Sequence, residues 1–271
     1  MIKNDLESKC LFLRKKILEV CLKAETGHVT SSLSCVEILV TLYYKGYLNI
    51  NSKDLEDDER DRFILSKAQA SPLLYLILAD LGLYDMKELD HFAQKNGMFG
   101  VHLQHSVPGV ETTAGALGHG LGLAAGIALR AKMDRKLYMT YTLLGDGELY
   151  EGSIWESMMF ASHNNLNNLV GIIDRNYLCT TDFTENLVEL EPLTEKVQSF
   201  GWNVVRIDGH NLHAIDNALK NLRARPSRKP TMLICDTVKG KGLDVMSFKP
   251  LCHGVPPKGE DAKKAKKQFY L

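Results

Sequence analysis

Apolar positions near the start of the chain repeat with the period of an α-helix. They predict a helix over residues 5–25, and Gly27 is a plausible stop just beyond it. One face of this helix collects Leu6, Cys10, Leu13, Ile17 and Val20. A helix with a single apolar face must pack against a core.

A second helix is expected to begin at Ser34. Its hydroxyl is suited to an N-cap, and Glu37 stands three residues later, as in a capping box. The acidic run 51–61 that follows is expected to be an exposed, solvated connection.

From residue 137 the pattern changes to short apolar and β-branched runs without alternation. These runs are Leu137 to Leu144, Leu169 to Ile173, Val204 to Ile207 and Met232 to Cys235. Helical stretches at about 152–165, 192–200 and 211–223 separate them. Unalternating strands between helices are typical of a parallel sheet covered on both faces. The sequence therefore predicts a three-layer, doubly wound α/β fold with a mostly parallel sheet.

Each predicted strand ends in a polar cluster. In chain order the clusters read GDGE, DRN, DGH and DTVKGKG. Ligands of parallel α/β sheets bind at the carboxyl ends of the strands, so these clusters are the first functional signal. The Pro- and Lys-rich tail from about residue 246 is expected to be an extension of a single domain spanning 1–271.

Composition narrows the class of protein. The 271 residues carry 33 Lys+Arg against 33 Asp+Glu, and this balance argues against a dedicated nucleic-acid binder. No apolar run reaches 18 residues, and the N-terminus lacks the apolar core of a secretory signal, so no membrane association is expected. The scattered cysteines form no CxxC pair, which favours a reduced, cytoplasmic protein.

Asp146 and Asn176 are the strongest candidates for chemistry. They stand thirty positions apart, about one strand–helix–strand unit, at the ends of two strands expected to be neighbours. A carboxylate and an amide oxygen so placed can share a Mg²⁺ ion whose other positions go to a carbonyl, water and a diphosphate. The motif GDG alone is as compatible with an ordinary turn as with a ligand site.

Several ordered motifs together resemble the amino-terminal half of the transketolase family. They are GDGE and DRN with their spacing, GHVTSSLS at 27–34, DRFILSK at 61–67, PGVETTAGALGHGLG at 108–122, GW at 201–202, DGH at 208–210 and TVKGKG at 237–242. The resemblance covers about residues 10–257, and it implies a thiamine diphosphate-binding fold.

The resemblance also implies roles for individual residues. Asp146 and Asn176 match metal-binding side chains, and Leu178 stands where the family offers a carbonyl to Mg²⁺, or to Ca²⁺ or Mn²⁺ in its place. Gly147 matches a contact of the diphosphate, and Gly115 and Leu117 match contacts of the aminopyrimidine ring. The active-site matches are His28, His102 and His253, with Glu151 matching a buried glutamate at the interface with a partner half. Histidine suits proton transfer because its unperturbed pKa lies near neutrality.

Two departures from the family pattern carry expectations of their own. Gln69 replaces a histidine that the family places beside the reacting sugar, and glutamine cannot become cationic. Either the acceptor chemistry differs or a partner supplies the missing function, and an altered substrate is the hypothesis adopted. The chain also stops before the pyrimidine-binding and carboxyl-terminal domains of a full-length transketolase.

These features imply the diphosphate-binding subunit of a split transketolase. It would transfer a two-carbon ketol unit between a ketose phosphate and an aldehyde. Its partner would be a C-terminal, pyrimidine-binding subunit in a two-plus-two heterotetramer. The alternatives are a specialised thiamine-dependent transfer onto an unusual sugar or keto acid, and a cofactor-binding scaffold without activity.

Overall fold

The computed structural model describes residues 6–50, 54–224 and 227–270. The strands are β1 (Arg62–Leu65), β2 (Thr140–Gly145), β3 (Leu169–Arg175), β4 (Asn203–Asp208) and β5 (Thr231–Asp236). The α-helices are α1 (Leu6–Ala24), α2 (Val29–Leu33), α3 (Val36–Tyr44), α4 (Ser71–Asp80), α5 (Gly120–Met133), α6 (Gly152–His163), α7 (Thr184–Leu187), α8 (Leu193–Ser199), α9 (Leu212–Ala224) and α10 (Gly259–Tyr270). Short 3₁₀ turns are η1 (Ala68–Ala70), η2 (Met86–His91) and η3 (Gly147–Tyr150).

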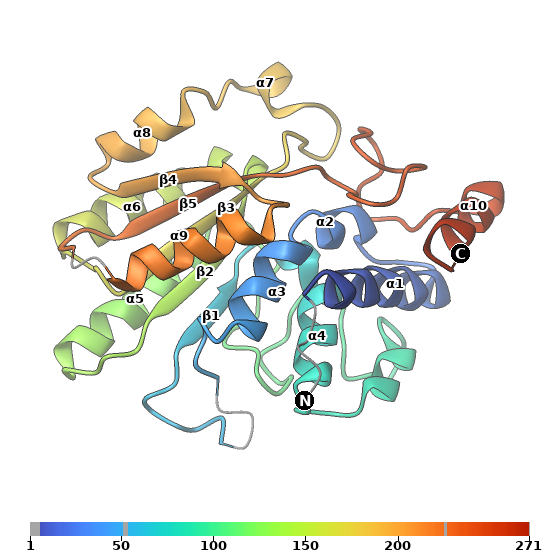
Figure 1. Ribbon diagram of the computed structural model, residues 1–271, viewed down its shortest axis with the longest axis horizontal. Helices are drawn as coiled ribbons and strands as arrows, with labels where there is room; N and C mark the ends of the chain where they lie inside the picture. Colours follow the sequence, from blue (N-terminus) through green and yellow to red (C-terminus); the bar gives the residue numbers. More distant parts are fainter. Residues whose placement is uncertain (1–5, 51–53, 225–226, 271) are drawn as a thin grey trace.

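Among the described residues the strands form one five-stranded sheet in the order β1-β2-β3-β5-β4, and every pairing is parallel (Figure 1). All strands therefore end at the same edge, which gathers the polar clusters that follow them. The predicted parallel α/β fold is confirmed.

Two apolar clusters lie on the two faces of this sheet. One contains the buried side chains of α1, α3 and α4 together with alternate strand residues such as Tyr141 and Ile172. The other joins α5, α6 and α8 to the remaining alternate residues, such as Leu144 and Ile173. Burial on both faces explains why the central strands read as unbroken apolar runs.

The predicted helices and strands are found with shifted ends. Residues 5–25, 152–165, 192–200 and 211–223 correspond to α1, α6, α8 and α9. The strand predicted from Leu137 begins at Thr140, because Leu137 is 91% exposed and lies before the sheet. The sequence analysis did not predict β1, whose four residues are too few for a periodic signal.

The predicted N-cap at Ser34 is wrong. Ser34 has helical backbone angles directly after α2, and Cys35 precedes α3 without a side-chain cap. The Ser34 hydroxyl instead donates to Asp174 at 2.6 Å, and Glu37 pairs with Arg14 rather than with the helix start. A tertiary contact thus takes the hydroxyl that a local cap would use.

The acidic connection is only partly as predicted. Residues 51–53 lie outside the described residues, and most of 54–59 is exposed. Arg60 and Asp61 are buried, and the Asp61 carboxylate accepts hydrogen bonds from the backbone N–H groups of Asn49 and Met139.

The tail beyond residue 246 returns to the body of the protein. Its helix α10, which the sequence analysis did not predict, packs against α1 and buries Ala265 and Phe269 (Figure 1). In the part of the chain that the structure describes, no helix is long and apolar enough to cross a membrane.

Candidate active site at the strand ends

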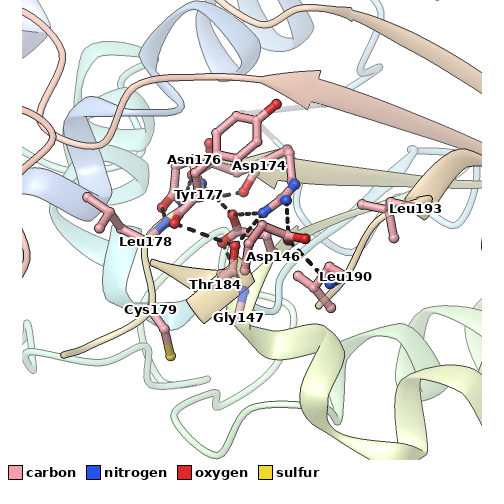
Figure 2. Close-up of polar contacts among 12 residues, drawn as sticks. Asp146, Gly147, Asp174, Asn176, Tyr177, Leu178, Cys179, Thr184, Leu190 and Leu193 are labelled. Carbon is pink, nitrogen blue, oxygen red and sulfur yellow. Dashed lines mark hydrogen bonds and ion pairs between the residues drawn. The ribbon is translucent and has the colours of Figure 1, made fainter. Parts of the chain in front are cut away.

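Asp146 and Asn176 lie side by side at the ends of the neighbouring strands β2 and β3 (Figure 2). Asp146 is buried, and its backbone N–H donates to the Asp174 carbonyl at 3.3 Å. Its carboxylate accepts from the N–H of Gly147 at 2.8 Å and from the N–H of Tyr177 at 2.6 Å. These backbone donors fix the orientation of the carboxylate.

Asn176 and Leu178 supply two more oxygen atoms beside this carboxylate. The Asn176 amide oxygen accepts from the Leu178 N–H at 3.2 Å, and the Leu178 carbonyl accepts from the Lys239 ammonium at 3.2 Å. The carbonyl thus already faces a positive charge.

The donor set fits a hard divalent ion, because Mg²⁺ and Ca²⁺ prefer carboxylate, amide and carbonyl oxygens. The described residues contain no group of three His, Cys, Asp or Glu placed to hold a metal. That finding agrees with a set in which only Asp146 is a carboxylate.

Gly147 lets the η3 backbone approach the loop after β3 closely. A Cβ atom at this position would lie 3.2 Å from the Cys179 sulfur, which is tighter than ordinary van der Waals contact. A side chain here would push the loop away from the strand ends.

Arg175 ties the following loop to Asp146. Its guanidinium is fully buried and contacts the Asp146 carboxylate at 3.1 Å, the Thr184 hydroxyl at 2.7 Å and the Glu185 carboxylate at 2.7 Å. It also stacks 4.1 Å from the centre of the Tyr177 ring. Burial and the neighbouring Asp174 charge still raise the pKa of Asp146 to about 6.

Asp174 organises the other side of the strand ends. Its carboxylate accepts from Ser34 at 2.6 Å, from Asn176 at 3.3 Å, and from Lys67 and Thr237. Burial alone would raise the pKa of Asp174, but the Lys67 charge and these donors lower it below its usual value. Three separate segments, carrying Ser34, Lys67 and Thr237, therefore converge on one buried, ionised carboxylate.

The three candidate histidines form one cluster. The ring centres of His28 and His102 are 5.3 Å apart, and those of His28 and His253 are 5.0 Å apart. The Nδ1 atom of His28 is buried without a hydrogen-bond partner among the described residues. Lys239 reaches this cluster as well, because its ammonium donates to His253 Nδ1 at 3.3 Å. One lysine thus joins the histidines to the Leu178 carbonyl.

The charges in this region keep two of the histidines neutral. Burial, followed by the charges of nearby cationic groups, lowers the pKa of His28 to about 4 and that of His253 to about 3. Burial and the Lys67 charge lower the pKa of Lys239 to about 8. Because an ammonium has no acceptor, His253 Nδ1 must be unprotonated, and its proton is therefore on Nε2.

Gly115 lies against the histidine cluster. A Cβ atom on Gly115 would be 3.7 Å from the Cβ atom of His102. Leu117 is half-buried in the same segment, which leads into α5. The glycine-rich stretch over residues 115–126 is a loop as far as residue 119 and then a helix that packs on β1 and β2.

Gln69 and Glu151 lie at the edge of the candidate site. Gln69 is half-buried in η1, which packs against α2, the helix that begins directly after His28. Glu151 is exposed at the start of α6 in this single chain, and its burial against a partner subunit stays a prediction. Glu151 borders the loop before α5, since a Cβ atom added to Gly118 would lie 2.6 Å from the Cβ atom of Glu151.

The sequence analysis assigned no role to several buried charged residues of this region. They are Lys67, Glu148, Asp174, Arg175 and Lys239. Each stands inside one of the quoted motifs, and charged residues within otherwise apolar or glycine-rich segments were the available signal.

The sequence of this chain matches a known protein family and several of its named members. A family model described as "Transketolase, thiamine diphosphate binding domain" matches residues 10–271. The chain is 37% identical over 244 residues to one subunit of the apulose-4-phosphate transketolase of Phocaeicola vulgatus, covering 90% of this chain and 86% of the relative. It is also 37% identical over 252 residues to the 6-deoxy-6-sulfo-D-fructose transketolase subunit SqwG of a Clostridium species, covering 93% and 91%.

A comparison with solved structures also finds transketolases. The transketolase of Campylobacter jejuni superimposes with a TM-score of 0.91 at 31% identity, over 99% of this chain. The match spans only 43% of that transketolase, whereas it spans most of the two relatives that are named as subunits.

Proposed function

Because this chain belongs to the family of transketolase thiamine diphosphate binding domains, we propose that it is the diphosphate-binding subunit of a two-subunit transketolase. It would transfer a two-carbon ketol unit from a ketose phosphate to an aldehyde acceptor. The observation that carries the proposal is the convergence of the Asp146, Asn176 and Leu178 oxygens beside the histidine cluster, with Lys239 joining the two.

In this proposal the strand ends hold the cofactor and its metal. Asp146, Asn176 and the Leu178 carbonyl bind Mg²⁺, and Gly147 lies against the diphosphate. Gly115 and Leu117 contact the aminopyrimidine ring. Thiamine diphosphate, when bound, supplies the electron sink for breaking and forming the C–C bond.

In this proposal the histidines bind the sugar substrate. His28 and His253 are neutral at pH 7, so they act as hydrogen-bonding groups rather than as fixed cations. His253 offers its Nε2–H to a substrate oxygen, because Lys239 occupies Nδ1. His102 adds a third imidazole beside His28.

A partner subunit completes the site in this proposal. The relatives from Phocaeicola vulgatus and the Clostridium species are named as transketolase subunits, which implies further subunits for those proteins. In this chain the outer faces of α5 and α6 carry exposed Leu123, Met159 and Phe160, so an apolar surface is free for association. We expect a pyrimidine-binding subunit in a two-plus-two heterotetramer, with Glu151 buried between subunits.

Two further expectations belong to the same proposal. The apolar clusters on the two faces of one sheet, with α10 packed on α1, support a single domain over residues 1–271 with an extension from about 246. The six cysteines, all within the described residues, form no disulfide there, which supports a reducing, cytoplasmic location.

The test is turnover with and without the partner. The chain should be co-purified with its pyrimidine-binding partner, then assayed with xylulose and ribose phosphates and a panel of other donors and acceptors. We expect turnover that requires Mg²⁺, thiamine diphosphate and both subunits. Ketose phosphate turnover by this chain alone would contradict the split site, and cofactor binding without any turnover would favour the inactive scaffold.

Gln69 favours a second candidate, a transfer onto an unusual sugar or keto acid. The named substrates of the two relatives above, apulose 4-phosphate and 6-deoxy-6-sulfo-D-fructose, are themselves uncommon sugars. Hydrogen bonds to charged groups contribute about 1.5–3 kcal/mol and neutral ones about 0.5–1.5 kcal/mol. We therefore expect Gln69→His to raise kcat/KM of the assembled enzyme for xylulose and ribose phosphates about 10-fold.

The matched control is Gln94→His, which adds the same imidazole at an exposed position outside the site. It should leave kcat/KM unchanged. A parent enzyme that already shows full ordinary turnover, with no gain from Gln69→His, would remove the argument for an altered substrate.

A further inference from the structure

Glu148 is a buried carboxylate to which the function proposed above gives no role. It lies in η3, only 1% exposed, and joins three segments of the chain. One oxygen accepts from the Ser66 hydroxyl and from the Gly118 N–H at 2.9 Å. The other accepts from the Gly145 N–H at 3.1 Å. We call these three hydrogen bonds the Glu148 clamp.

The direction of each hydrogen bond in the clamp is fixed. The Ser66 oxygen accepts from the Gly120 N–H at 3.2 Å, so the single hydroxyl proton of Ser66 is directed to Glu148. Both oxygens of Glu148 therefore face donors only. Burial raises the pKa of Glu148, while the hydroxyl and the Gly118 N–H act against that rise. An amide in place of this carboxylate would set an N–H group against at least one of these donors.

The Glu148 clamp acts on residues 118–120, whose backbone is also restrained by other contacts. The Gly118 carbonyl accepts from the Ser153 hydroxyl at 2.9 Å, so both polar groups of Gly118 are held. Gly118 has a φ of +88°, and a Cβ on Gly120 would lie 2.3 Å from the Ser66 side chain. The segment therefore sits directly on the ends of β1 and β2.

The residues just before these anchors are more open. Gly115 and Ala116 are exposed and line a cavity of about 320 Å³ together with Ser66 and Gly120. The anchors at 118 and 120 thus fix the base of a loop whose tip is accessible. That tip contains Gly115, which lies against His102.

We infer that Glu148 is a positioning residue, which holds residues 115–120 in place before the ring of the cofactor binds. The geometry of the clamp is independent of any ligand, whereas the identity of the ring rests on the proposed function. A loop fixed in advance loses less conformational freedom on binding, so affinity for the ring is higher. Ser66 and Lys67 are consecutive, so one turn after β1 serves both the Glu148 clamp and the Asp174 carboxylate.

Amide hydrogen exchange of the full chain tests the clamp directly. In Glu148→Ala we expect the Gly118 amide to exchange at least 10-fold faster, and in Ser66→Ala the Gly120 amide as well. Amides of β3 should keep their rates, because the opening is local. The control Glu195→Ala changes an exposed glutamate of α8 and should leave all these rates as they are. Unchanged exchange at Gly118 and Gly120 in both variants would overturn the clamp.

Binding to the assembled enzyme tests the positioning role. Ser66→Ala should weaken Mg²⁺-dependent binding of thiamine diphosphate about 10-fold. It should change the binding of inorganic pyrophosphate, which lacks the ring, less than threefold. Equal losses for both probes, or no loss for thiamine diphosphate despite faster exchange, would overturn the role. A parent enzyme that binds no thiamine diphosphate would refute the proposed function, and the exchange rates would still decide whether the clamp exists.

Discussion

Asp146→Asn is expected to weaken the Mg²⁺-dependent binding of thiamine diphosphate by two to three powers of ten. The substitution removes the only carboxylate of the proposed metal site and leaves the buried Arg175 guanidinium without that partner. The affinity falls because the bound metal ion loses its carboxylate; breaking a buried charge pair costs about 3–5 kcal/mol, and each 1.4 kcal/mol is about a factor of ten in affinity. Isothermal titration of the assembled enzyme with thiamine diphosphate, at several Mg²⁺ concentrations, measures the effect.

The matched control is Asp244→Asn, which removes the same charge from an exposed position. It should bind the cofactor as the parent does. Asp146→Asn protein that remains folded by circular dichroism and keeps the parental metal dependence would contradict the assignment of Asp146 as a ligand.

Lys67→Met is expected to lower the free energy of unfolding by about 3–5 kcal/mol, because Asp174 would be left as a buried charge without its cation. Lys67 and Asp174 are 5% and 0% exposed in their side chains, so water cannot replace the lost partner. For a protein of this size the melting temperature should fall by roughly 5–15 °C. Thermal unfolding followed by circular dichroism measures it.

Two further variants make the test specific. Adding Asp174→Asn to Lys67→Met removes the stranded charge and should restore part of the loss, which measures the coupling between the two groups. Lys136→Met removes a lysine whose partner, Glu59, is 58% exposed in its side chain, and it should leave the stability nearly unchanged. Equal effects of the two lysine substitutions would show that the buried pair contributes nothing special.

The sequence predicts the fold well wherever burial produces a long pattern. α1 and the apolar runs of β2, β3 and β5 are recognisable because each buries a continuous face or is covered on both sides. The short strand β1 lacks such a pattern, and Ser34 has a local cap signal that loses to a distant carboxylate. Local propensity cannot show whether the Ser34 hydroxyl will cap the adjacent helix or donate to the distant Asp174 carboxylate.

The candidate site was predictable in its metal and histidine residues but not in its supporting charges. Asp146 and Asn176 are recognisable because parallel strands end at one edge, and the histidines because of the family resemblance. Lys67, Asp174 and Lys239 come from the ends of β1, β3 and β5, and only the strand order brings them together. The strand order in the sheet cannot be predicted from the spacing of residues along the chain.

The strand order also determines when the site can form during synthesis. β5 lies between β3 and β4 in the sheet, although it leaves the ribosome after both. A nascent chain that ends before residue 231 therefore has β3 and β4 with no strand to join them. Thr237 and Lys239 follow β5, so they reach Asp174 and the Leu178 carbonyl only after β5 has been made. Pairing of such distant segments is slow, so Asp174 lacks its hydrogen bond from Thr237, and the Leu178 carbonyl its contact with Lys239, until β5 joins the sheet.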